Sequence, residues 1–131
     1  MTVQKIETTA APAAIGPYSQ AIQAGSLVFL SGQIPLDPAT GVLVAGGIEP
    51  QARQVMNNLR AVLQAADLDF ANLVRTTIYL VDLDDFAVVN RIYGECFGET
   101  PPARVTVQVA ALPKGALIEI DGVAVEGGAR N

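Results

Sequence analysis

Two charged residues in the C-terminal third of the chain could together handle a small acid. Arg104 opens the segment ARVTVQV directly behind Pro101 and Pro102, and Glu119 lies within ALIEIDGVAV. A guanidinium group can hold a carboxylate through two parallel hydrogen bonds, and a glutamate can accept a proton or orient a water molecule. The pair therefore indicates a site for a small carboxylic acid. The alternative is that both residues are surface charges at the edge of a sheet.

Both segments have the composition of β-strands, so their side chains should alternate between the two faces of a sheet. The aliphatic face, which should pack under helices, comprises Val105, Val107, Val109, Ile118 and Ile120. The polar face comprises Arg104, Thr106, Gln108, Glu119 and Asp121, and we expect Thr77 and Tyr79 to join it. That face is too polar for a core, so it is either in contact with water or buried against another subunit.

The two charges should not meet within one chain. Arg104 begins one strand, and Glu119 lies near the beginning of the next, which should run in the opposite direction. At about 3.3 Å per residue, the two would lie on the order of 20 Å apart. We therefore expect that a site using both takes its arginine and its glutamate from different subunits.

The N-terminal half of the chain predicts a hairpin followed by a helix. Two short apolar runs predict strands over 18–24 and 26–32. The prolines and Gly41 of QIPLDPATG predict a loop. Apolar residues at helical spacing then predict an amphipathic helix over 52–66, with Pro50 in its first turn.

The second half continues with alternating strands and helices. β-Branched residues predict a strand over 73–81. The DLDD cluster that follows supplies capping and acidic residues for a helix whose inner face runs from Phe86 to Phe97 and which should end at Gly98. The order is β-β-α-β-α-β-β, and each β-α-β step implies parallel strands. We expect an α+β two-layer sandwich, with two helices on one face of a mixed sheet.

Length and composition narrow the possible functions. The 131 residues suit a single domain spanning 1–131. A formal charge of −5 and the absence of a basic run argue against nucleic acid as a partner. The chain has no histidine, which argues against a zinc site or a Ser-His-Asp triad. No apolar run is long enough to cross a membrane, and a lone cysteine, Cys96, favours the reducing cytoplasm.

Five segments, in order along the chain, form a pattern that resembles a known family. They are AIGPYSQAI (14–22), SGQIP (31–35), QARQVMNNL (51–59), PAR (102–104) and LPKGALIEI (112–120). They are similar to segments of the RidA or YjgF-type family, the reactive-intermediate deaminases. The most specific part is the Pro-Ala-Arg signature followed, after a short turn, by Ile-Glu-Ile. The resemblance implies a chorismate-mutase-like fold and a homotrimer, with the sheets forming a central barrel and three sites at subunit clefts.

The resemblance also implies an activity, the hydrolysis of reactive enamines and imines of 2-keto acids. Such compounds, typified by 2-aminoacrylate, 2-iminopropanoate and 2-iminobutanoate, are unstable products of pyridoxal-phosphate-dependent dehydratases. The family converts these small molecules to the 2-keto acid and ammonia, and it uses no cofactor or metal of its own.

Roles for individual residues follow from the same resemblance. Arg104 matches the arginine that clamps the substrate carboxylate, and Glu119 matches the glutamate that positions or activates water. Further substrate-binding positions would be Tyr18, Ser31, Gly32 and Asn90. Many members carry a cysteine where this chain has Thr106. Because water can attack an imine carbon directly, we expect Thr106 to line the pocket and activity to persist.

Two other classes of function remain as alternatives. The first is a non-catalytic metabolite-binding or regulatory trimer that keeps the arginine clamp. The second is an endoribonuclease or translation inhibitor, as some relatives are described. The acidic composition and the lack of a basic run argue against this second class.

Overall fold

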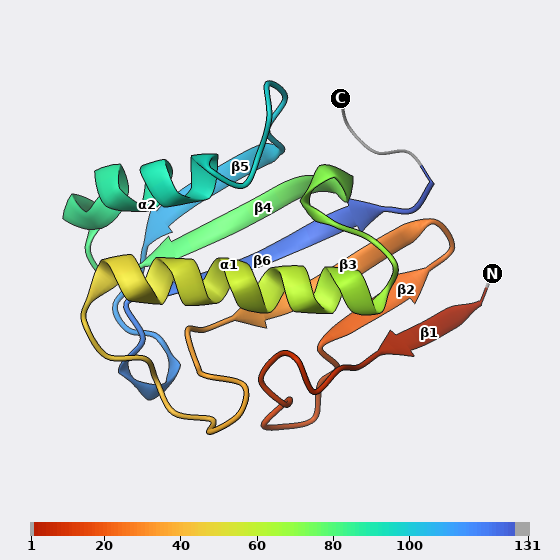
Figure 1. Ribbon diagram of the computed structural model, residues 1–131, viewed down its shortest axis with the longest axis horizontal. Coiled ribbons are helices and arrows are strands. Elements are labelled where there is room, and N and C mark those ends of the chain that lie inside the picture. Colours follow the sequence, from red (N-terminus) through yellow and green to blue (C-terminus); the bar gives the residue numbers. More distant parts are fainter. Residues whose placement is uncertain (1, 128–131) are drawn as a thin grey trace.

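The computed structural model describes residues 2–127, which form a sheet with two α-helices packed on it (Figure 1). The strands are β1 (Val3–Ile6), β2 (Ala21–Ala24), β3 (Leu27–Gln33), β4 (Leu73–Leu80), β5 (Ala103–Gln108) and β6 (Ile118–Val125). The helices are α1 (Ile48–Ala65) and α2 (Phe86–Gly94). Short 3-10 helices span Phe70–Asn72, Leu83–Asp85 and Pro113–Gly115.

The strands lie in the order β1-β2-β3-β6-β4-β5. β4 and β5 pair in parallel, and every other neighbouring pair is antiparallel. Because β3 and β4 are both antiparallel to β6, they are parallel to each other, as the predicted β-α-β step requires. Both helices cover the same face of the sheet (Figure 1). The predicted α+β sandwich with a mixed sheet is therefore confirmed.

The sequence pattern does not predict β1. This strand has four residues, three of which are exposed, so it carries no buried row of side chains to reveal it. It pairs antiparallel with β2, with Val3 opposite Ala24, and extends the sheet at one edge.

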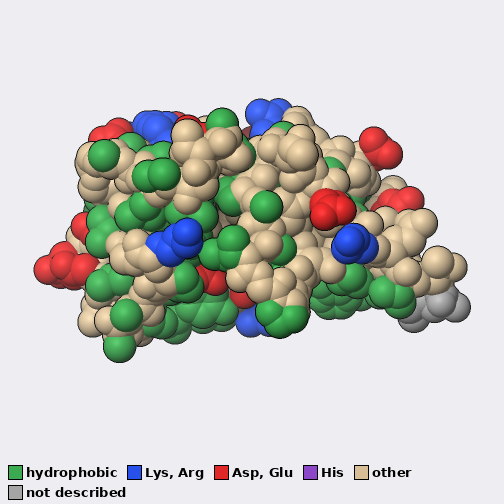
Figure 2. Space-filling model, turned by 90° about the horizontal axis from the view of Figure 1, so that it is seen from below, with side chains coloured by type: hydrophobic (Ala, Val, Ile, Leu, Met, Phe, Trp, Pro, Cys, Tyr) green, Lys and Arg blue, Asp and Glu red, His purple; other side chains and the backbone are tan. Residues whose placement is uncertain are grey.

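The surface shows no gathering of basic side chains on the side seen in Figure 2. Hydrophobic side chains and tan groups, which are the backbone and the other uncharged side chains, cover most of that side, and basic and acidic side chains are scattered among them (Figure 2). Arg53, Arg60 and Arg91 each form an ion pair with a carboxylate. Neither α1 nor α2, the α-helices of the described chain, has the length and apolar character needed to cross a bilayer.

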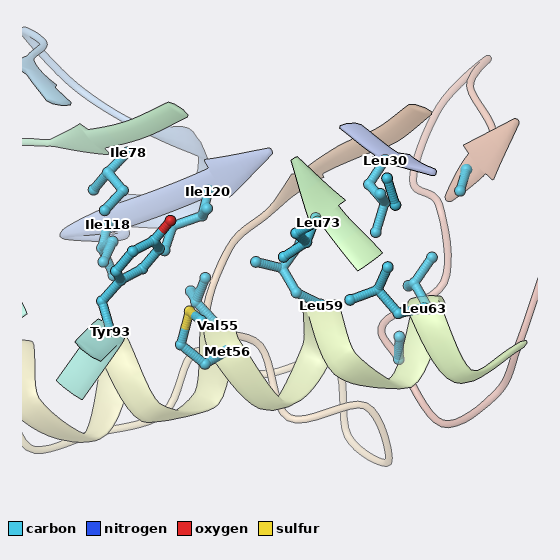
Figure 3. Packing of buried hydrophobic residues seen from close by; sticks show 14 of the residues in the cluster. Leu30, Val55, Met56, Leu59, Leu63, Leu73, Ile78, Tyr93, Ile118 and Ile120 are labelled. Atoms are coloured by element: carbon cyan, nitrogen blue, oxygen red, sulfur yellow. The ribbon is translucent and has the colours of Figure 1, made fainter. Parts of the chain in front are cut away.

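The hydrophobic core lies between α1 and the covered face of the sheet (Figure 3). The buried apolar residues of α1 are Ala52, Val55, Met56, Leu59, Val62 and Leu63. They pack against strand residues that include Leu30, Leu73, Ile78, Ile118 and Ile120. Burying one leucine or isoleucine side chain completely contributes about 1.5–3 kcal/mol to the free energy of unfolding. The predicted helical stripe is confirmed, and because the helix begins at Ile48, Pro50 lies in its first turn.

α2 is shorter than predicted, because it ends at Gly94 rather than at Gly98. Phe97 lies beyond the helix, yet its ring still packs against Tyr93, with the centroids 4.7 Å apart. At the other end, the Asp82 carboxylate accepts a hydrogen bond of 2.9 Å from the Asp84 N–H. The DLDD cluster therefore caps the 3-10 turn that leads into α2, whereas the N-cap residue of α2 itself, Asp85, makes no side-chain capping hydrogen bond.

The predicted faces of β5 are wrong, because its polar residues point to the helix side. Arg104 pairs with Thr76 of β4, and Thr106 pairs with Ile78. Both β4 residues are buried under the helices. Since paired residues point to the same face of a sheet, Arg104, Thr106 and Gln108 all lie on the covered face.

The valines of β5 consequently lie on the open face, where Val105 and Val107 are 42% and 38% exposed. β5 is the last strand of the sheet, and on its covered face the Phe86 and Tyr93 rings of α2 lie beside Arg104. The faces of β6 are as predicted: Ile118 and Ile120 are buried, and Glu119 points to the open face.

Candidate active site

A β-bulge in β3 lies beside a cleft in the surface. The register between β3 and β6 slips after Leu30, so that Ser31 and Gly32 both stand opposite the single residue Asp121. A bulge of this kind bends a strand and redirects its side chains, and bulges are frequent beside active sites. Whereas the sequence pattern favours a strand that ends at this point, β3 continues to Gln33.

Gly32 makes room for the carboxylate of Glu119. A Cβ atom at position 32 would overlap Glu119 Oε2 and would lie only 2.9 Å from Glu119 Cδ. A cleft of about 430 Å³ surrounds this carboxylate, and its lining residues are Ile15, Tyr18, Ser31, Gly32, Ile34, Pro113 and Glu119. The fold thus brings together four of the predicted site residues from three separate segments of the chain.

The surroundings of Glu119 favour its protonated form. Partial burial raises the pKa of Glu119 above its ordinary value of 4.5, and the negative charge of Asp121, two residues away on the same face, raises it further. A carboxyl group whose pKa is shifted towards neutral pH is better matched to accept and return a proton.

Tyr18 reaches the cleft from the loop between β1 and β2. Its side chain is 49% exposed, and its hydroxyl accepts a hydrogen bond of 3.3 Å from the Ile15 N–H. Gln20, only 4% exposed, holds this loop in place. Its side-chain amide accepts a hydrogen bond from the Thr8 N–H at 2.7 Å and donates to the Thr8 and Pro12 carbonyls at 3.0 and 2.8 Å.

Ser31 connects this loop to the bulge. Its N–H donates to the Gln20 carbonyl at 3.0 Å, and its hydroxyl donates to the Ser19 carbonyl at 2.6 Å. The Ser31 hydroxyl therefore positions the wall of the cleft. The sequence pattern predicts a strand over 18–24, but β2 begins only at Ala21, so Gln20 lies in the loop before it. Its role as a buried, hydrogen-bonded side chain was not predicted.

Arg104 lies on the other side of the sheet, at the start of the edge strand β5. Its Cζ atom is 5.2 Å from the ring centroid of Tyr93 and 5.5 Å from that of Phe86, both on α2. Within residues 2–127 its guanidinium forms no ion pair with a carboxylate. A guanidinium that stacks on aromatic rings and lacks an anionic partner is suited to bind a carboxylate ligand.

Two more predicted residues lie near this arginine. The Thr106 hydroxyl oxygen is buried and has no hydrogen-bond partner among the described residues. Asn90 lies four residues after Phe86 and three before Tyr93, so it shares a helix face with the two rings. Arg104, Thr106 and Asn90 therefore form a second group of predicted site residues.

The two groups are separated within the chain. Arg104 pairs with Thr76, and Glu119 pairs with Tyr79, which is three positions further along β4. Arg104 and Glu119 are therefore offset by three residues along the strands and by two strand spacings across the sheet. These offsets place their Cα atoms about 14 Å apart, which is less than the distance of about 20 Å expected from the sequence. Their side chains nevertheless point to opposite faces, and α2 and β5 contribute no residue to the cleft around Glu119.

The open face of the sheet is partly polar and partly apolar. The Tyr79 hydroxyl donates a hydrogen bond of 3.0 Å to Asp121 Oδ2, and Thr77 pairs with Asp121. These two residues, with Glu119, confirm the predicted polar part. The same face also exposes large apolar side chains, which are Leu27, Phe29, Val105 and Val107.

A larger hollow of about 770 Å³ lies where β1 meets the C-terminal ends of α1 and β6, and it contains none of the predicted site residues. Its lining includes the exposed Lys5 and Glu7. Among residues 2–127, no group of three or more cysteine or acidic side chains is placed to hold a metal ion.

Comparisons with known proteins find a matching family model and similar chains. A family model described as Endoribonuclease L-PSP matches residues 8–126. The chain is 58% identical to protein DfrA of Myxococcus xanthus, over 95% of this chain and 97% of that protein. It is 52% identical to a protein of Mus musculus named 2-iminobutanoate/2-iminopropanoate deaminase, over 93% of this chain and 90% of that protein. The crystal structure of RidA from Psychrobacter sp. PAMC 21119 superposes with a TM-score of 0.90 at 44% identity, covering 93% of this chain and 98% of that one.

Proposed function

The chain belongs to the Endoribonuclease L-PSP family, also known as the YjgF/RidA family, and on that premise we propose that it hydrolyses imines of 2-keto acids to the keto acid and ammonia. One observation carries the proposal. Among residues 2–127, no cationic side chain lines the cleft around Glu119, and no carboxylate forms an ion pair with Arg104, which faces the other side of the sheet. The Glu119 cleft offers a proton acceptor, and Arg104 offers a cationic group that can bind the substrate carboxylate. The names of several relatives at about 50% identity support the reaction class.

The complete site would form between copies of the chain. We propose a homotrimer in which the edge strand β5 of one copy brings Arg104 to the Glu119 cleft of the next. The exposed apolar residues of the open face, such as Phe29 and Val107, would then be buried between subunits, with the sheets forming a central barrel. Closed cyclic symmetry would give three equivalent sites.

In the proposed mechanism, Arg104 binds the substrate carboxylate through two parallel hydrogen bonds and so fixes the imine carbon. A water molecule beside Glu119 adds its oxygen to that carbon while Glu119 accepts the water proton. The electron pair of the C=N bond moves to nitrogen, which takes up a proton, and a carbinolamine results. Glu119 then accepts the hydroxyl proton and returns a proton to the amino nitrogen, so that the C=O bond forms as the C–N bond breaks and the nitrogen leaves with the bonding electron pair as neutral ammonia.

The remaining predicted residues would shape this site. Tyr18 and the backbone of Ser31 and Gly32 would enclose the substrate on the Glu119 side. Asn90 and Thr106 would do so on the Arg104 side, where the Thr106 hydroxyl, which has no hydrogen-bond partner in the described part of the chain, can donate to or accept from a ligand. The reaction is hydrolytic, so the proposed mechanism draws only on water and these side chains. A positioned proton relay typically contributes about 10²–10⁴-fold.

A coupled assay tests the proposal. A threonine or serine dehydratase generates the imine, and release of keto acid is followed with and without this protein. Arg104→Ala should remove the acceleration, on the order of 10²-fold or more in kcat/KM, because two charge-assisted hydrogen bonds are lost. Arg104→Lys should also perform poorly, because lysine lacks the planar fork. Arg53→Ala, which removes an exposed arginine of α1, is the matched control. Wild-type rates in both Arg104 variants would refute the mechanism.

The same protein preparations separate the alternatives. A regulatory trimer would bind 2-ketobutyrate or pyruvate but would leave imine decay unchanged. The family description names an endoribonuclease, so RNA cleavage is assayed on extensively purified protein beside Arg104→Ala. A cleavage activity that falls with purification and is the same in the wild-type and Arg104→Ala proteins belongs to a contaminant.

A further inference from the structure

The two rings beside Arg104 differ in their surroundings. Phe86 is 37% exposed at the start of α2, whereas Tyr93 is only 4% exposed near its end. The guanidinium lies slightly closer to the Tyr93 ring, at 5.2 Å against 5.5 Å for Phe86. Arg104 thus rests on one ring at the surface and on one that belongs to the core.

The Tyr93 ring is held in place by a hydrogen bond at its hydroxyl and by a neighbouring aromatic ring. Its hydroxyl and the hydroxyl of Thr76 form a buried hydrogen bond of 2.6 Å. Thr76 is itself the strand partner of Arg104, so one residue of β4 orders both the arginine backbone and the ring beneath its side chain. Phe97 packs against the ring with a centroid separation of 4.7 Å, and Figure 3 shows Tyr93 reaching from α2 towards the sheet.

We infer that Tyr93 is a positioning residue for Arg104: its buried, hydrogen-bonded ring holds the guanidinium ready for a substrate carboxylate. The inference rests on the proposed function for its catalytic meaning. A free arginine side chain has many rotamers, and fixing them on binding costs affinity. A ring that already restrains the guanidinium removes part of that cost, and the cation–π attraction adds to the effect.

The kinetic test compares two substitutions at position 93. Tyr93→Leu removes the ring and should raise KM about 2- to 30-fold with a smaller change in kcat, because the carboxylate is held by Arg104 before and during the reaction. Tyr93→Phe keeps the ring and should remain within about threefold of wild type. A purely structural role would instead lower the active fraction, and with it kcat, while leaving KM unchanged.

The chain offers a matched control in a second arginine–aromatic pair. Arg60 lies over the Phe70 ring at 5.7 Å, and Phe70 also packs against Phe97. Phe70→Leu therefore removes a ring of the same aromatic cluster from beneath an arginine outside the proposed site. It should lower the melting temperature and leave KM at the wild-type value.

A spectroscopic measurement decides the inference without relying on activity. In wild-type protein, NMR should show nuclear Overhauser contacts between the Tyr93 ring protons and the Arg104 δ-methylene, and a high order parameter for the Arg104 Nε–H bond. Absence of those contacts overturns the inference even if Tyr93→Leu fails to fold, and so does a wild-type KM in Tyr93→Leu. If wild-type protein neither binds pyruvate nor accelerates imine hydrolysis, the proposed function fails, while the NMR result still shows whether Tyr93 holds Arg104.

Discussion

Glu119 illustrates how the surroundings of one residue set its chemistry. The carboxylate lies over Gly32 in a partly buried cleft and has Asp121 as a negatively charged neighbour. Burial and the charge of Asp121 both disfavour ionisation. Glu119 must nevertheless be ionised to accept a proton from water. Its raised pKa should therefore be visible in the pH dependence of the proposed reaction.

The activity should fall on the acid side as Glu119 takes up a proton, with a midpoint above 4.5, the ordinary value of its pKa. Asp121→Asn removes the neighbouring charge, which should lower the pKa of Glu119 and move the acid limb of kcat/KM to lower pH. The Tyr79 hydroxyl can still donate to the asparagine oxygen. The measurement is kcat/KM against pH, corrected for spontaneous hydrolysis. An acid limb that stays in place or moves to higher pH would contradict the assignment of Glu119 as the base.

At the scale of elements, the bulge of β3 and the loop before β2 build the cleft together. The two residues of the bulge stand opposite one residue of β6, and Ser31 is hydrogen-bonded to the carbonyls of Ser19 and Gln20. Buried Gln20 in turn holds the loop that carries Tyr18. The positions of Ser31 and Tyr18 in the cleft thus depend on hydrogen bonds between segments.

The bulge predicts an unusual effect for Gly32→Ala. The added methyl group would overlap the end of the flexible Glu119 side chain, which can rotate away at little cost. We therefore expect the melting temperature to change little, while kcat falls at least about tenfold because the carboxylate that we propose as the general base is displaced. Gly98→Ala, whose added Cβ would meet no atom within 4 Å, is the control for a glycine-to-alanine change. A Gly32→Ala protein with full activity would show that the position of the Glu119 carboxylate is unimportant.

For the whole molecule, the decisive feature is the separation of Arg104 from Glu119. The two lie on opposite faces of one sheet, with β4 between their strands. A side chain cannot cross a hydrogen-bonded sheet, so a site that uses both needs two copies of the chain. The apolar groups exposed on the open face provide a surface for that association.

Mixing two inactive proteins tests the shared site. Arg104→Ala and Glu119→Gln should each be inactive alone. After unfolding and refolding together at equal amounts, random trimers should place an intact Arg104 opposite an intact Glu119 in about a quarter of their sites. Keto-acid release should therefore recover to about that fraction of wild type. Refolding each variant separately is the control, and no recovery in the mixture would refute a site shared between subunits.

The sequence alone determined the elements and most of the candidate residues. The helical stripe of α1, the order of the later elements and the mixed sheet follow from periodicity, because burial against a single layer imposes a period on each segment. Residue type and strand alternation singled out Glu119, and the family resemblance supplied Tyr18, Ser31 and Gly32; the structure places all four around one cleft. The strand β1 escaped prediction because it is short and largely exposed.

Only the tertiary structure decided which way the side chains point. Alternation along β5 separates Arg104 from Val105 but does not say which of them faces the helices. On an edge strand beyond α1, the valines are left exposed, and the rings of α2 cover the arginine instead. The same holds for the bulge at Ser31 and Gly32 and for the loop held by Gln20. These features depend on contacts between segments distant in sequence, which a local pattern does not contain.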